Sequence, residues 1–324
     1  MEVLKRSAHG YAQDPTKNLD FGRFEGCGNP DVALIVAAFE KTAGCWKQFA
    51  LSDVEIDRIK KKKVVRLEFE EPNKFFINEN FDSYDYDFYK VLTLCPYTAT
   101  YLNRLQGELR RVPIFFPFNY SHTPIITEKK YDVIYTGHIV SQHVLKDLKT
   151  ISRFNYRLVS NSKHALVTNR GVDYNEKLTL ISQSRITLVH NLLYPTFRHL
   201  RNIWSYPEWQ NNLAFSELPP PWRMARFFTN RSAMVVPQLK SRAFEAAFSR
   251  SLILCKRDPF NIIEKYFEPE KEFIYFDEGC LSEAVARILQ SYSDYQPVID
   301  RAFERAKKEY TTDAFFHKFL RDIK

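Results

Sequence analysis

The sequence has few cysteines and no arrangement of them that suits a metal or a disulfide framework. Five occur in 324 residues, with no CxxC pair, and they are Cys27, Cys45, Cys95, Cys255 and Cys280. An odd, scattered set of this kind excludes a disulfide-stapled secreted scaffold and a structural zinc site. Cys95 and Cys255 stand in apolar segments, where cysteine behaves as a small buried hydrophobe.

Long apolar runs are also absent. The longest covers residues 32–39, which is far too short to span a bilayer, and the opening MEVLKRSAHGYAQ lacks the core of a signal peptide. We therefore expect a soluble, cytoplasmic protein and leave peripheral contact with a membrane surface open. The chain also has no internal repeat, low-complexity tract or heptad pattern.

The charge balance favours anionic partners. Lysine and arginine number 47 against 39 aspartates and glutamates, a formal net charge of +8. A nucleotide diphosphate, an anionic glycan, a membrane face or nucleic acid would each suit such a surface. We expect no nucleic acid, because the lysine run at 60–63 has no interleaved aromatic residues and no nucleic-acid motif occurs.

Short apolar segments alternate with helical patterns along the first half of the chain. They cover residues 31–39, 64–69, 90–94 and 110–116, a rhythm typical of βαβ units and a parallel sheet. Ligands bind beyond the carboxyl ends of such strands. Glu70 and Glu71 follow the segment 64–69, so they are candidates for a general base in an acceptor pocket. The alternative is an ordinary acidic turn.

The second half repeats this rhythm after an irregular linker at 120–130. Strands are predicted at 131–136, 156–160 and 185–190. The residues at or just past their ends are candidate contacts for a nucleotide, or for proton transfer in the case of the histidines. They are Gly137, His138, Ser160, Asn161 and His190. Each histidine could equally be a core residue with a satisfied hydrogen bond.

Residues 236–276 contain four predicted helices and strands in close succession. Helices are predicted at 239–250 and 261–267, and strands at 251–255 and 272–276. An apolar stripe accounts for most of the first helix but leaves Lys240, Arg242 and Glu245 outside it. Cations in a first helical turn oppose the helix dipole, so an anion over this turn explains them better than helix stability does.

The run KSRAFEAAFSRSLILCKRDPFNIIEKYFEPEKEFIYFDE within this segment resembles the donor-site signature of group-1-type glycosyltransferases with the GT-B fold, and especially the CgeB-like branch. The resemblance implies an α/β chain with two Rossmann-like domains whose parallel sheets face a central cleft. It implies that Glu245 holds the ribose hydroxyls of a nucleotide sugar, while Lys240, Arg242 and the helix amides hold the diphosphate. Many relatives carry another glutamate eight residues before Glu245, where this chain has Pro237.

The resulting prediction is a hexosyltransferase-like enzyme that moves a sugar from a nucleotide-sugar donor to a glycan or other hydroxyl acceptor, which could be anionic. No metal cofactor is expected, since Asp85-Tyr86-Asp87 precedes its strand and reads as surface. Residues 1–125 would form the acceptor domain, 126–308 the donor domain, and 309–324 a helix crossing back to the first domain. The tryptophan-rich stretch 197–230 is either a loop beside the acceptor or a packed insertion. The alternatives are a nucleotide-sugar epimerase of this fold and a non-catalytic protein that binds an anionic glycan or nucleic acid.

Overall fold

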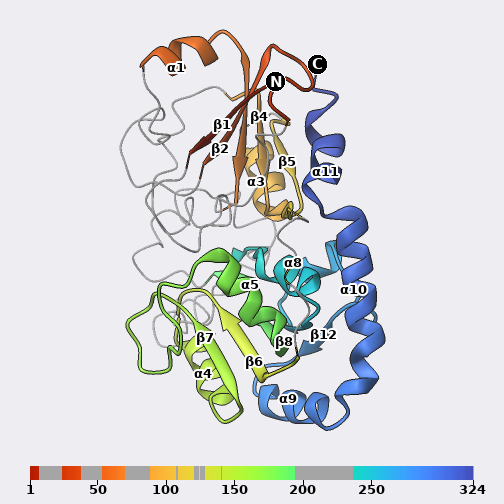
Figure 1. Cartoon of the computed structure of the whole chain (residues 1–324). Helices are drawn as coiled ribbons and strands as arrows, with labels where there is room; N and C mark the ends of the chain where they lie inside the picture. The colour runs from red at the N-terminus through yellow and green to blue at the C-terminus, as the bar shows by residue number, and fades with distance from the viewer. Residues whose placement is uncertain are drawn as a thin grey trace. The chain divides into compact units, whose positions relative to one another are not determined.

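The computed structural model of the chain contains two compact units (Figure 1). It describes residues 1–6, 24–37, 53–69, 88–106, 109–119, 124, 128–139, 141–193 and 236–323. The first unit comprises Met1–Phe116, Leu192–Gln238 and Thr312–Lys324, and the second comprises Pro117–Asn191 and Leu239–Thr311. The chain passes between these units after residues 116, 191, 238 and 311, and the domain limits expected from the sequence stand at 125 and 308.

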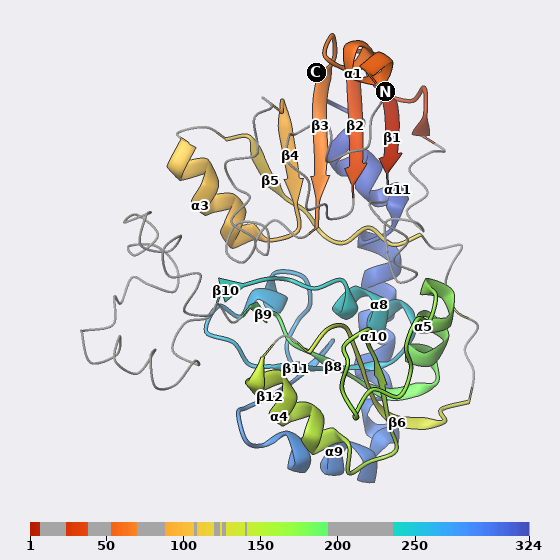
Figure 2. The same cartoon turned by 90° about the vertical axis from the view of Figure 1, so that its left-hand side faces the viewer.

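A parallel sheet forms the centre of the first unit. Its strand order follows the chain, β1-β2-β3-β4-β5, and Figure 2 shows these strands side by side. The strands are β1 (Glu2–Arg6), β2 (Val32–Ala37), β3 (Lys63–Glu68), β4 (Lys90–Thr93) and β5 (Arg111–Pro113). The last strand is shorter than the expected span 110–116.

Strand β1 is not among the strands expected from the sequence, the first of which begins at residue 31. Its five residues alternate too little to mark a strand by pattern, and the pairing with β2 determines its conformation. The carboxylate of Glu2, largely buried, lies 2.5 Å from Arg58 and 3.3 Å from Lys62. Arg58 belongs to helix α1 (Asp53–Ile59), so contacts distant in sequence anchor this strand.

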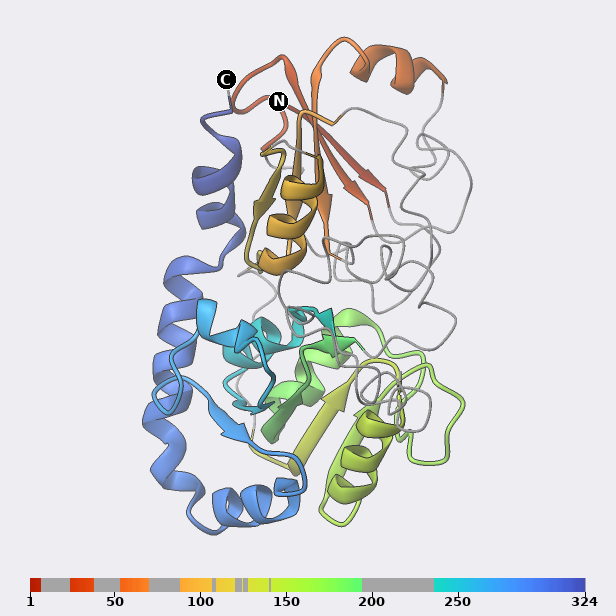
Figure 3. The ribbon, with the colours of Figure 1, turned by 180° about the vertical axis from the view of Figure 1, so that it is seen from behind.

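Helical segments from two distant parts of the chain pack in the first unit. Helix α3 (Pro96–Gln106) lies against β4 and β5, as Figure 3 shows. The chain ends with α11 (Thr312–Phe315) and a π-helical turn, η10 (Phe316–Leu320). Phe316 stacks on Phe24 with ring centroids 4.1 Å apart, and Phe315 meets Phe115 edge to face. The C-terminal segment is thus held to this unit by aromatic packing.

The second unit has a parallel sheet of different topology, with the strand order β12-β11-β8-β6-β7. Its strands are buried almost throughout, as expected of a sheet covered on both faces. Their bounds are β6 (Tyr131–Thr136), β7 (Tyr156–Val159), β8 (Ser184–Val189), β11 (Leu252–Lys256) and β12 (Ile274–Phe276). The predicted strands of this half are confirmed.

Helices flank this sheet in two groups. Helix α4 packs against α9, while α8 packs against α5 and α10. Side-chain caps begin two of them, because Ser141 accepts from Val144 N–H at the start of α4 and Asp173 accepts from Glu176 N–H at the start of α5. The helices are α4 (Gln142–Ile151), α5 (Tyr174–Ser182), α8 (Arg242–Phe248), α9 (Leu281–Gln290) and α10 (Gln296–Glu309), with short 3₁₀ turns η8 (Ile262–Lys265) and η9 (Tyr292–Tyr295).

The expected α/β class with two Rossmann-like domains is confirmed, because each unit is built on an all-parallel sheet with connecting helices. A short antiparallel pair, β9 (Leu192–Leu193) with β10 (Val236–Pro237), lies outside both sheets. None of the helices in the described ranges has both the length and the apolar character needed to cross a membrane.

Candidate functional site

The strand order of the second sheet predicts where a ligand binds. From β6 the chain runs to β7 on one side and then returns to β8 on the other, so the direction reverses between β6 and β8. In doubly wound sheets the ligand crevice lies at such a switch point, beyond the carboxyl ends of the strands. Gly137 follows β6 and His190 follows β8, so two of the predicted residues stand at this point.

Gly137 leaves space for the side chain of Arg242. Its φ is +126°, a backbone conformation that side chains oppose, and a Cβ atom there would collide with the Arg242 guanidinium. The N–H of Gly137 donates to the Val159 carbonyl at 2.9 Å. The amide of this candidate nucleotide contact therefore already has a partner inside the sheet. The glycine serves instead to admit the guanidinium.

Arg242 places a cation over the end of β6. It is the first residue of α8, its side chain is 8% exposed, and its guanidinium lies 4.5 Å from the centre of the Tyr135 ring. No hydrogen bond or ion pair to Arg242 occurs within the part of the chain that the structure describes. Guanidinium carries five N–H donors in a plane that matches phosphate or carboxylate oxygens. Such a group favours an external anion.

Helix α8 is shorter than the predicted span 239–250, since it has seven residues and begins at Arg242. Lys240 thus precedes the helix, and its N–H donates to Oδ1 of Asn191 at 3.1 Å. The amide of Asn191 also contacts the Cys255 sulfur at 3.6 Å, which fixes this turn against the ends of β8 and β11. The case for an anion therefore rests on the Arg242 side chain rather than on a long helix dipole.

Glu245, the predicted ribose ligand, lies inside the second unit. Its side chain is completely buried, and Oε1 accepts hydrogen bonds from Lys177 Nζ at 2.9 Å and from Tyr174 O–H at 3.2 Å. Oε2 has no hydrogen-bond partner within the described ranges. Both donors belong to α5, so Glu245 joins α5 to α8 through one oxygen, while its other oxygen is buried without a partner among the described residues.

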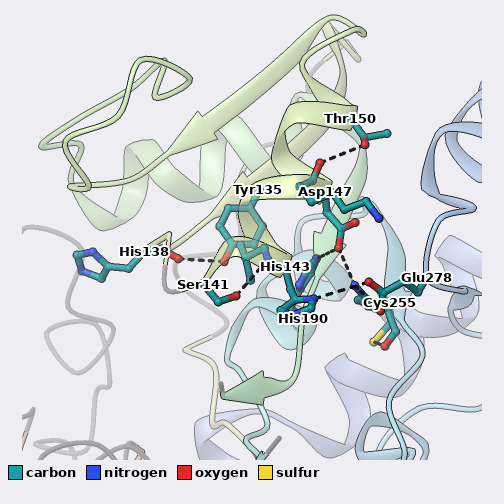
Figure 4. A network of polar contacts seen from close by, with 12 residues as sticks. Tyr135, His138, Ser141, His143, Asp147, Thr150, His190, Cys255 and Glu278 are labelled. Atoms are coloured by element: carbon teal, nitrogen blue, oxygen red, sulfur yellow. Dashed lines mark hydrogen bonds and ion pairs between the residues drawn. The ribbon is translucent and has the colours of Figure 1, made fainter. Parts of the chain in front are cut away.

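His190 belongs to a network of charged groups (Figure 4). Its Nε2 lies 3.5 Å from Oδ2 of Asp147 on α4, and that carboxylate also accepts from Lys256 Nζ at 3.1 Å. Glu278 lies 3.7 Å from Lys256 and 3.7 Å from His143. Burial, and then the charges of Lys256 and Arg242, hold the pKa of His190 well below its ordinary value. The imidazole is therefore neutral near pH 7.

Burial also affects Asp147, whose pKa it raises, while the charge and hydrogen bond of Lys256 oppose the rise. Asp147, Lys256 and Tyr135 were not among the residues singled out from the sequence. One signal for Asp147 was available, because it interrupts the buried stripe of Val144, Leu148 and Ile151 on α4. A carboxylate in such a stripe needs a buried partner.

Ser160 and Asn161 shape the loop after β7. Ser160 is fully buried and its Oγ accepts from Ser162 N–H at 3.0 Å, while Oδ1 of Asn161 accepts from Gly171 N–H at 3.2 Å. Ser162 in turn accepts from the N–H of Ile139 at 3.0 Å, so this loop is tied to the loop after β6. Both predicted residues hold loop geometry next to the switch point.

His138 is exposed beside Gly137, and its carbonyl accepts from Tyr135 O–H at 3.2 Å (Figure 4). The structure thus brings Gly137, His138, His190, Lys240 and Arg242 to one edge of the sheet. Several other predictions lie outside the described residues, namely Glu70, Glu71, Asp85-Tyr86-Asp87 and the stretch 197–230. Across the described segments, no group of three or more histidine, cysteine or acidic side chains is placed to hold a metal ion.

No model of a known protein family matches the sequence, and no curated protein matches it either. Solved structures do resemble the fold. Anabaena Alr3699/HepE in complex with UDP matches with a TM-score of 0.57 at 10% identity, over 98% of each chain. A TarM variant from S. aureus, in complex with fondaparinux, α-GlcNAc-glycerol and UDP, matches with a TM-score of 0.51 at 9% identity, over 89% of this chain and 54% of that one.

Sucrose-phosphate synthase from Thermosynechococcus elongatus matches with a TM-score of 0.50 at 10% identity, over 87% of this chain and 70% of that one. The chain spans about half the length of the TarM structures and between 76% and 98% of the HepE chains. At such identities the likeness shows the fold. It is the GT-B fold, built from two Rossmann-like domains.

Proposed function

We propose that this protein is a glycosyltransferase that takes a sugar, of the hexosyl type, from a nucleotide-sugar donor and attaches it to a hydroxyl of a glycan. The observation that carries the proposal is Arg242, a nearly buried guanidinium at the switch point of the second sheet without an anionic partner among the described residues. Gly137 makes room for it, so the local backbone is adapted to this cation. A diphosphate supplies the negative charge and the oxygen acceptors that the site lacks.

The comparisons support uridine nucleotides as the first donors to test. Anabaena HepE structures with this fold contain UDP or UDP-glucose, and the TarM variant contains UDP together with glycan compounds. The formal net charge of +8 supports an acceptor that carries negative groups. The CgeB-like branch stays a proposal that rests on the sequence of residues 240–278.

Different residues of the second unit would bind different parts of the donor. Arg242, with Lys240 beside it, would hold the diphosphate and stabilise the charge that develops on it as the glycosidic bond breaks. Oε2 of Glu245 would accept the ribose hydroxyls, since Oε1 is already engaged by Lys177 and Tyr174. These two cationic side chains would neutralise the diphosphate in place of a metal ion, so we propose metal-independent transfer. Glu70, Glu71 and exposed His138 stay the candidates for the acceptor base; His190 is buried and neutral.

One observation favours a second function. Pro237 stands where many relatives of the resembled family carry a glutamate, and it lies in the two-residue strand β10, where its carbonyl accepts from the Cys95 sulfhydryl. A donor site without that carboxylate would suit a protein that binds a nucleotide sugar without transferring it. An epimerase of the same fold is the remaining alternative. We propose a cytoplasmic location, with membrane-surface contact left open.

A turnover experiment separates these functions. The protein is incubated with radiolabelled UDP-glucose or UDP-GlcNAc, with and without a mixture of glycan acceptors, in the presence of a chelator. Transfer predicts labelled glycan and free UDP only when the acceptor is present. Epimer formed without acceptor would identify the epimerase, and binding without either product would identify the non-catalytic protein.

A further inference from the structure

His190 is a buried histidine whose ring makes no hydrogen bond to the described residues. The side chain is 3% exposed, and neither ring nitrogen has a hydrogen-bond partner within the described ranges. Buried polar atoms are nearly always paired in native proteins, and each exception calls for an explanation. Among the described residues, no carbonyl or hydroxyl group holds the ring as it would in an ordinary core histidine.

Charged groups reach His190 from several elements. Asp147 on α4 places a carboxylate oxygen 3.5 Å from Nε2, and Lys256 at the end of β11 bonds to the same oxygen. Glu278, after β12, pairs with Lys256 on the side toward solvent. Arg242 on α8 completes the set: its guanidinium lies over the face of the Tyr135 ring, while His190 meets the same ring edge-on with centroids 5.9 Å apart.

The other ring contacts of His190 that the described ranges contain are with neutral groups. Tyr135 on β6 and Phe276 on β12 contact it through their rings, the latter at a centroid distance of 6.2 Å. Burial raises the pKa of Cys255 well above its ordinary value, so this thiol on β11 also carries no charge. Two cations, Arg242 and Lys256, therefore oppose protonation of His190, and one carboxylate is already in place to balance an imidazolium.

Resting on the function proposed above, we propose that His190 takes up one proton from solvent when the diphosphate of the donor binds beside Arg242. The bound anion cancels the field of the Arg242 cation at the ring. Asp147 then faces Nε2 as the counter-ion of the new imidazolium. Donor binding and protonation of His190 are thus coupled, and His190 acts as a positioning residue that adds a positive charge beneath the diphosphate only when the diphosphate is present.

The coupling sets the direction of the pH dependence. In the free protein the pKa of His190 lies well below its ordinary value, and the bound anion raises it. Between these two values the complex holds one proton more than the free protein, so affinity increases as pH falls, by up to about tenfold per pH unit. Above the higher value and below the lower one, both states hold equal numbers of protons and affinity is constant.

The test is titration calorimetry of the whole chain with UDP-glucose, or with whichever nucleotide sugar a thermal-shift panel selects. Both phosphates of such a donor are esterified, so they lack the ionisation that a terminal phosphate shows near pH ~6. The binding heat is measured between about pH 5.5 and about pH 8 in buffers with different ionisation enthalpies, which gives the number of protons taken up. The wild type should take up protons across this range, approaching one per bound donor.

Three variants show whether His190 is the residue that takes up the proton. His190→Gln should abolish the uptake, while His317→Gln, which changes an exposed histidine of the first unit, should leave it unchanged. Asp147→Asn removes the counter-ion of the imidazolium, so proton uptake should move to lower pH. This variant tests the proposal if His190→Gln does not fold. Uptake that survives in His190→Gln would overturn the proposal, as would a wild type that binds donor with no uptake. If no nucleotide sugar binds at all, the proposed function falls and the coupling falls with it.

Discussion

The Nζ atom of Lys177 lies 2.9 Å from Oε1 of Glu245, and both side chains are buried. The two residues stand 68 positions apart in the sequence, on α5 and α8. Removing one member of such a pair leaves a buried charge without its partner, which destabilises proteins by about 3–5 kcal/mol. Glu245 thus has a structural role that any test of its ligand role must separate.

We expect Glu245→Ala to lower the free energy of unfolding by about 3–5 kcal/mol, measured by urea denaturation, because Lys177 then stays buried and uncompensated. Lys177→Met should have a similar effect. The double variant Lys177→Met/Glu245→Ala should lose much less than the sum of the two, since no unpaired charge remains. Additive losses would show that the pair does not stabilise the fold as a unit.

Gly137→Ala tests the space that Arg242 occupies. The new Cβ would collide with the guanidinium, so we expect the variant to bind nucleotide sugar at least about tenfold more weakly and to lose roughly 1–3 kcal/mol of stability. Gly279→Ala is the matched control, because Gly279 has φ of +87° but a Cβ added there would meet no atom within 4 Å. Gly279→Ala should lose stability because of backbone strain, but it should bind the nucleotide sugar as tightly as the wild type does. Equal binding in both variants would contradict the steric role of Gly137.

The buried amine of Lys129 should make the stability of the protein depend on pH. Its Nζ donates to the carbonyls of Ser182, Ser184 and Arg250, and burial, with a smaller contribution from Arg185, lowers its pKa to about 8. Between that value and the ordinary 10.5, the unfolded chain holds the proton that the folded protein has lost. Stability must therefore rise with pH across this window.

Comparison with Lys129→Met isolates this effect from other titrating groups. The free energy of unfolding of the wild type relative to the variant should increase from about pH 8 to about pH 10. A difference that is flat or falls over this range would show that the folded protein does not lower the pKa of Lys129. The variant should also be less stable overall, because three carbonyls lose their shared donor.

Much of the second unit was predictable, because its buried strands and amphipathic helices have clear periods. The segment from Lys240 to Glu245 was recognisable for the same reason, because its polar residues lie outside a clear apolar stripe. The partners of these residues could not be predicted. That Glu245 meets Lys177, or that Gly137 admits Arg242, depends on the strand order β12-β11-β8-β6-β7, which local periodicity does not contain.

The same limit applies to His190. A histidine after a strand could be a ligand, a base or a satisfied core residue, and only the positions of Asp147, Lys256 and Tyr135 distinguish these roles. Strand β1 was missed for a related reason, because its pairing with β2 and the ion pairs of Glu2 determine it more than its own five residues do. Contacts between distant segments thus account for most of what the sequence left open.

The most direct test of the central claim is donor binding at Arg242. Thermal shifts with UDP, GDP, CMP, ADP and their common sugars are measured without metal on the wild type, Arg242→Gln and Arg287→Gln. Arg287 is an exposed arginine on α9, so its variant makes the same charge change away from the switch point. At a hundred times the dissociation constant, a ligand stabilises the native state by ~2.7 kcal/mol.

We predict that one nucleotide class stabilises the wild type and Arg287→Gln, and that Arg242→Gln binds it about ten- to a hundredfold more weakly, as expected when a hydrogen bond to a charged group is lost. Equal binding by Arg242→Gln and the wild type, or stabilisation by an anionic glycan and by no nucleotide, would contradict the account.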